Sequence, residues 1–137
     1  MFSVFSKDKQ DIKSNKTISN IQDWQIISET VGLSEGFIRE FSYRLDWFYI
    51  SKHQVLSEGF IRENSNKVDW YNISQYQTLS EKFIREFSDE VDWQNISCYQ
   101  KLSEGFIREF SDKLDLEIIK HNQKLSPEFI KELDMGL

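Results

Sequence analysis

The stretches WYNISQYQTLSEKFIREF (residues 70–87) and WQNISCYQKLSEGFIREF (residues 93–110) are two copies of one pattern, 23 residues apart. The third and fourth copies agree at 17 of 23 positions, which indicates tandem duplication. The same spacing relates leucines, phenylalanines and tryptophans along the chain: Leu33, Leu56, Leu79, Leu102, Leu125; Phe37, Phe60, Phe83, Phe106, Phe129; Trp24, Trp47, Trp70, Trp93. A fixed period of this length is typical of a repeat array, in which each unit buries its apolar face against the next.

Five repeats follow from cutting the sequence at the recurring aspartates: residues 23–45, 46–68, 69–91, 92–114 and 115–137. Residues 1–22 match the pattern poorly and contain the polar stretch DKQDIKSNKT. We therefore expect them to form a short, partly flexible N-terminal cap on the array.

Each repeat contains two sites where a helix is expected to begin. Ser57 is a good N-cap with Glu58 in the first turn, and Asp46 is the equivalent cap for the other helix. These signals predict a helix over about residues 47–54 and another over about residues 58–66. Such short helices are unstable alone in water, so stacking between repeats has to stabilise them. The predicted fold is all-α: an α-solenoid of five 23-residue helix-turn-helix repeats.

The leucine-rich repeat is the competing fold at this period. Its L-x-x-L-x-L strand pattern is absent, and the caps are helical.

The recurring strings resemble short tandem repeats of large DNA viruses and bacteriophages, in which D/N-W-x-x-I-S-x-x-Q-x-L-S-E-x-F-I-R-E-F recurs. The resemblance covers residues 23–137 and implies a viral or mobile-element origin, and with it a role against a host factor. It transfers no catalytic or ligand residue. The fifth repeat departs from the pattern at Leu116, Lys120 and Pro127.

The charge of the chain is unevenly distributed. The net charge is −6, residues 1–22 contribute +2, and the repeats therefore carry −8. An acidic body argues against direct binding to nucleic acid, whose phosphates attract clusters of Lys and Arg. With one cysteine, no secretory signal and no apolar run of about 18 residues, we expect a cytoplasmic protein (host cytoplasm if viral) without membrane contact.

No motif for enzymatic chemistry is present, and no cofactor is expected. Phosphate-binding glycine loops and nucleophile elbows are absent. Glu58 and Arg62 are spaced for an ion pair within one helix, and five equivalent copies of a catalytic acid would be unusual. Cys98 and His121 occupy the same position in neighbouring repeats, and His53 lies one position away, but a metal needs three or four converging ligands. We therefore predict no metal site and no enzyme.

Recognition is expected at positions that vary while the repeat frame stays constant. Three such rows run along the array: Gln25, Phe48, Tyr71, Gln94, Glu117; Ile26, Tyr49, Asn72, Asn95, Ile118; Thr30, His53, Tyr76, Tyr99, Asn122. Aromatic side chains dominate interface energetics. The candidate partner-binding residues are therefore Phe48, Tyr49, Tyr71, Tyr76 and Tyr99.

The leading functional hypothesis is a non-enzymatic protein-binding module that presents one face of the array to a protein partner. In its narrower form the partner is a host defence factor that a viral protein occludes. Two alternatives stay open: a self-assembling structural protein, and an acidic mimic of nucleic acid that occupies a basic groove. For the leading hypothesis we expect a monomer.

Overall fold

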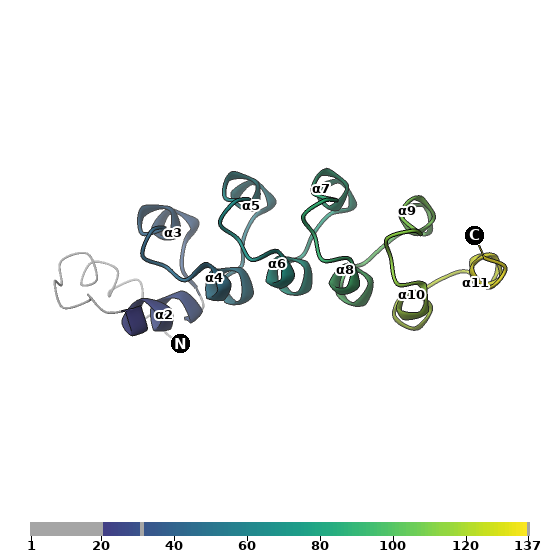
Figure 1. The fold of residues 1–137 in the computed structure, drawn as a ribbon, viewed down its shortest axis with the longest axis horizontal. Helices are drawn as coiled ribbons and strands as arrows, with labels where there is room; N and C mark the ends of the chain where they lie inside the picture. Colours follow the sequence, from purple (N-terminus) through teal and green to yellow (C-terminus); the bar gives the residue numbers. More distant parts are fainter. Residues whose placement is uncertain (1–20, 31, 137) are drawn as a thin grey trace. The chain divides into compact units, whose positions relative to one another are not determined.

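The computed structural model describes residues 21–30 and 32–136, which are helical and contain no strand (Figure 1). The chain divides into two compact units, Met1–Asp69 and Trp70–Leu137. Helices alternate between two rows within each unit. We call the first helix of a repeat its A helix and the second its B helix. The predicted all-α solenoid of helix-turn-helix repeats is confirmed. Most of the predicted N-terminal cap, residues 1–22, lies outside the described residues.

In the first unit the A helices are α2 (Ile21–Glu29) and α4 (Trp47–His53), and the B helices are α3 (Glu35–Glu40) and α5 (Glu58–Glu63). The second unit contains three repeats. Its A helices are α6 (Trp70–Tyr76), α8 (Trp93–Tyr99) and α10 (Leu116–Asn122), and its B helices are α7 (Glu81–Glu86), α9 (Glu104–Glu109) and α11 (Pro127–Asp134).

The predicted caps begin the helices. The Ser57 hydroxyl accepts a hydrogen bond from the backbone N–H of Phe60, and the Asp46 carboxylate accepts one from Phe48. These bonds satisfy N–H groups that the first helical turn leaves without an intrahelical partner. Pro127 occupies the first turn of α11, as its fixed φ favours.

The helices end earlier than predicted. Helix α5 stops at Glu63 and not near residue 66, and the backbone N–H groups of Lys67 and Val68 turn back to the Asn64 carbonyl. Side chains of the following A helix also use carbonyls of this turn in other repeats: Trp47 Nε1 donates to Ser42 O, and Trp93 Nε1 to Ser88 O, both at 2.9 Å. The carbonyl groups of this turn thus accept hydrogen bonds from the next A helix, and the B helix does not extend through the turn.

Helix α2 also differs from the prediction. It begins at Ile21, so Asp23 lies inside its first turn and does not cap it. The boundary that the sequence suggested between the N-terminal cap and the first repeat, at residues 22 and 23, therefore falls within α2.

The first four repeats contribute the same apolar positions to the core. The fourth repeat provides Ile96, Leu102, Phe106, Ile107 and Leu114, all buried. Its tryptophan, Trp93, is half-buried and stacks on Phe106 and Phe110, with ring centroids 6.4 and 5.1 Å apart. Because a repeat of two short helices offers little surface of its own, this core has to continue into its neighbours.

The A helices pack directly on one another: α2 on α4 in the first unit, and α6 on α8 and α8 on α10 in the second. A fully buried serine lies in the first four A helices, at positions 28, 51, 74 and 97. Its small side chain permits the close approach and leaves room for a hydrogen bond to the next repeat, described below.

Candidate partner-binding surface

The five predicted partner-binding residues all lie on A helices, two in the first unit and three in the second. In the first unit Phe48 is exposed and Tyr49 is half-buried. Tyr49 packs edge-on against Phe48 and stacks on His53, and its hydroxyl accepts a hydrogen bond from Gln25 Nε2 at 2.9 Å. Tyr49 therefore joins two repeats, which leaves Phe48 as the more accessible of the pair.

The second unit places three tyrosines on the adjacent helices α6 and α8. Tyr71, Tyr76 and Tyr99 are 56%, 48% and 57% exposed, values that are high for such large side chains. Tyr76 and Tyr99 occupy the same position of consecutive repeats. We call Tyr71, Tyr76 and Tyr99 the tyrosine surface.

Helices α6 and α8 carry no Asp, Glu, Lys or Arg, in contrast to the B helices. Beside the tyrosines their other exposed or half-exposed positions are Trp70, Gln75, Trp93, Gln94 and Cys98. The three tyrosines are thus exposed aromatic side chains on two helices without ionic residues, whereas the neighbouring B helices α7 and α9 carry Glu, Lys and Arg. Tyrosine offers a large apolar ring and a hydroxyl at a low cost in conformational entropy, a combination suited to protein recognition.

One predicted row of variable positions is partly structural. Asn72 and Asn95 are buried, and Asn95 Nδ2 donates to the Tyr71 carbonyl of the preceding repeat at 3.1 Å. Asn95 thereby joins α8 to α6, so the row cannot serve recognition along its whole length.

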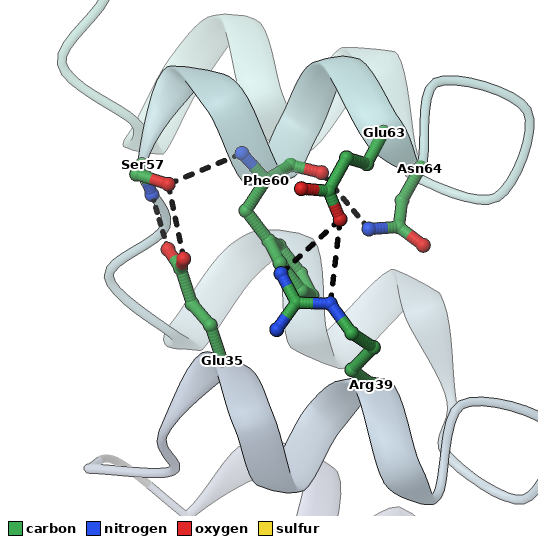
Figure 2. A network of polar contacts seen from close by, with 6 residues as sticks. All are labelled: Glu35, Arg39, Ser57, Phe60, Glu63 and Asn64. Atoms are coloured by element: carbon green, nitrogen blue, oxygen red, sulfur yellow. Dashed lines mark hydrogen bonds and ion pairs between the residues drawn. The ribbon is translucent and has the colours of Figure 1, made fainter.

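The recurring acids and arginines bind the neighbouring repeat. Figure 2 shows the interface between repeats one and two. Arg39 donates from Nε and Nη2 to Glu63 Oε2 at 3.3 and 3.1 Å, and its guanidinium lies 5.1 Å from the Phe60 ring centroid. Glu35 accepts from the backbone N–H and the hydroxyl of Ser57 at 2.6 and 3.0 Å. The Glu and Arg of α3 thus both bind groups of α5, where the sequence suggested a pair within one helix.

The same ion pair recurs in the second unit in bidentate form. Arg85 binds both carboxylate oxygens of Glu109 at 2.9 and 2.7 Å, and Arg108 binds those of Glu132 at 2.7 and 2.8 Å. Hydrogen bonding from these arginines lowers the pKa of Glu109 and of Glu132. The four side chains are about half-exposed, so each pair contributes more to geometry than to stability.

A buried glutamine, which sequence reasoning did not single out, clamps the loop of the preceding repeat. Gln100 Nε2 donates to the carbonyls of Ser74 and Gln77 at 2.9 and 2.7 Å, and its Oε1 accepts from Leu79 N at 3.1 Å. Gln54 makes the equivalent contacts with Ser28, Thr30 and Leu33. The signal in the sequence was the constancy of glutamine at positions 54, 77, 100 and 123 beside variable neighbours.

The buried serines provide a second link that sequence reasoning missed. Ser74 Oγ donates to Trp70 O at 2.7 Å and accepts from Asp92 N at 2.9 Å, so it connects its own helix to the start of the next A helix. Ser28 and Ser97 do the same toward Asp46 and Asp115.

The potential metal ligands do not converge. His121 Nδ1 lies 2.8 Å from the Glu117 carbonyl of its own helix, and Cys98 is half-buried. Within residues 21–30 and 32–136 no three His, Cys, Asp or Glu side chains form a group that could hold a metal ion.

No protein-family model, curated protein or solved structure matches this chain. None of the helices in the described part of the chain is long and apolar enough to cross a membrane.

Acid is expected to weaken the links between the B helices. Because arginine lowers the pKa of Glu109 and Glu132 in the folded state, their contribution is present above the unfolded value of about 4.3 and is lost as pH falls through the lower folded value. Thermal unfolding at pH 7 and pH 3 should show a smaller acid-induced decrease in Tm for E109Q/E132Q than for the wild type. The control D89N/E90Q removes two carboxylates from an exposed turn; an equal change in that variant would contradict the assignment.

Proposed function

We propose that the protein is a non-enzymatic binding module, and that the tyrosine surface on helices α6 and α8 contacts a protein partner. The observation that carries this proposal is the exposure of Tyr71, Tyr76 and Tyr99 on two adjacent helices without ionic side chains. Such residues are the usual anchors of protein interfaces, and their burial by a partner removes large apolar area from water.

The roles of the recurring polar and charged residues support a binding role over an enzymatic one. In the interfaces described above, the recurring Glu and Arg side chains are used to join repeats, and Gln and Ser bind backbone groups. The resemblance to repeats of large DNA viruses and bacteriophages makes a host protein the narrower candidate for the partner. Occlusion of a functional surface on that protein would then be the mechanism.

The acidic-mimic alternative has one observation in its favour, the net charge of −8 over the repeats. Its complexes would weaken steeply with salt, because two highly charged surfaces would form the interface. A complex through the tyrosine surface would show little salt dependence. Titration of the partner at low and high salt therefore distinguishes the two functions.

Substituting alanine for the three tyrosines is expected to abolish partner binding and to leave the fold intact. Each truncation at the centre of an interface costs about 2 kcal/mol or more, so the triple variant should bind at least about 1,000-fold more weakly. The measurement is affinity capture with the wild-type chain as bait, followed by titration calorimetry with the captured protein. Circular dichroism of Y71A/Y76A/Y99A should match the wild type, since all three side chains are about half-exposed or more.

Tyr43 offers a matched control. It is 78% exposed and lies in the turn after α3, where it contacts Arg44. Tyr43→Ala should retain full binding. Retained binding by Y71A/Y76A/Y99A, or equal loss in Tyr43→Ala, would reject the tyrosine surface.

A further inference from the structure

The links between repeats have a direction. At the interface between repeats three and four, the preceding repeat supplies Ser74, Glu81 and Arg85. Ser74 accepts from the backbone of the following repeat, Glu81 accepts from Ser103, and Arg85 binds Glu109 and covers Phe106 at 5.4 Å. The following repeat returns two amide side chains to backbone groups of the preceding one: Gln100, the clamping glutamine, and Asn95, which donates to the Tyr71 carbonyl.

The same three supplying residues act at the two other interfaces contained within one unit. They are Ser28, Glu35 and Arg39 toward repeat two, and Ser97, Glu104 and Arg108 toward repeat five. A repeat therefore holds its successor with a serine in the A helix and with a glutamate and an arginine in the B helix.

In repeat five all three supplying positions carry other residue types. Lys120 stands at the serine position, Pro127 at the glutamate position and Lys131 at the arginine position. Lys120 binds Asp134 at 2.8 Å and Glu117 at 3.2 Å, so it bonds within its own repeat. Proline offers no carboxylate, and lysine lacks the planar fork that binds a carboxylate through two hydrogen bonds.

Repeat five keeps the glutamine, serine and glutamate that bind the preceding repeat. Gln123 clamps the backbone of Leu102 and Gln100, Ser126 binds Glu104, and Glu132 binds Arg108. Repeat one shows the opposite pattern: its supplying residues are present, but its sequence has valine, at position 31, where the other four repeats have the clamping glutamine.

We infer that repeat five is an end repeat whose outward face cannot form the links used inside the array, and that repeat one lacks the glutamine with which a repeat clamps the one before it. A sixth repeat, whether joined to the chain or presented by a second copy, meets no serine, glutamate or arginine at the three supplying positions of repeat five. The inference rests on residue types and contacts, and it goes beyond the proposed function. It argues against growth by head-to-tail stacking, which the self-assembly alternative would require.

Transferring the end residues into repeat four tests this inference in the full chain. The variant S97K/E104P/R108K should release repeat five, because Ser97, Glu104 and Arg108 make its supplying links. Proline is compatible with the first helical position, so α9 should persist. Hydrogen exchange of the Leu116–Asp134 amides should accelerate by about 100-fold or more, while α6 and α7 keep wild-type protection.

The control Q94E/G105E transfers two other residues of repeat five into repeat four, at exposed positions without an interrepeat role, and should exchange as the wild type does. Wild-type protection of repeat five in S97K/E104P/R108K would overturn the inference. Equal loss of protection in every repeat would also overturn it, because the substitutions would then act on the whole fold and not on one link.

The reverse experiment adds a sixth repeat. A second copy of residues 115–137 is fused after Leu137, either to the wild-type chain or to K120S/P127E/K131R. The added copy should exchange at least about 10-fold more slowly on the restored chain than on the wild-type chain. Equal exchange of the added copy on the two chains would overturn the inference.

Discussion

Replacing Gln100 by leucine is expected to lower the free energy of unfolding by about 3 kcal/mol, although the substitution preserves the size of the side chain. The amide binds three backbone groups of the preceding repeat: Ser74 O, Gln77 O and Leu79 N. Gln100 is only 5% exposed, so water cannot replace these bonds without opening the interface. Each buried backbone group left without a partner costs about 1–3 kcal/mol.

The measurement is urea unfolding monitored by circular dichroism, with hydrogen exchange to locate the change. Gln94→Leu is the matched control, because Gln94 lies on α8, the helix that Gln100 caps, and is exposed. It should change stability by less than about 0.5 kcal/mol. If Gln100→Leu were as stable as Gln94→Leu, the glutamine would not clamp the repeats.

Phe106→Ala is expected to be at least as damaging, with a loss of about 3–5 kcal/mol. Its ring is 1% exposed, contacts Phe110 and Trp93 within its own repeat, and lies beneath the Arg85 guanidinium of the preceding repeat. Truncation removes apolar contacts and leaves a cavity that two short helices cannot fill. It also removes the surface on which the guanidinium of Arg85 packs.

Phe48 provides the control for this substitution, since it occupies an A helix but is 45% exposed. Phe48→Ala should unfold close to the wild-type midpoint, and hydrogen exchange should place the damage of Phe106→Ala in repeats three to five. Similar midpoints for the two variants would contradict the assignment of Phe106 to the shared core.

The helix starts could be predicted from the sequence because they depend on local chemistry. A serine or aspartate cap acts on N–H groups two or three residues away, and its effect does not depend on the neighbouring repeat. The helix ends could not be predicted equally well. The turn from Asn64 to Val68 and the use of the Ser42 carbonyl by Trp47 depend on the path of the chain into the next repeat.

The ion-pair and hydrogen-bond partners of the charged and polar residues could not be predicted from the sequence either. An Arg four residues after a Glu fits an ion pair within one helix as well as a pair with a Glu 24 residues later. Only the distance between Arg39 and Glu63 distinguishes the two. Gln100 looked like an ordinary polar residue, because burial is not visible in a sequence. The tyrosine surface stays a prediction that the exposure of its residues makes testable.

The most direct test of the interdependence of the repeats is the far-ultraviolet circular dichroism of a peptide spanning residues 92–114 alone. Its helices, α8 and α9, are far shorter than the roughly 12–15 residues that an isolated helix needs in water. We predict the spectrum of an unfolded chain without a cooperative melting transition, beside a helical spectrum for the full protein. A helical peptide that melts cooperatively would show that one repeat folds without its neighbours, and would contradict the account.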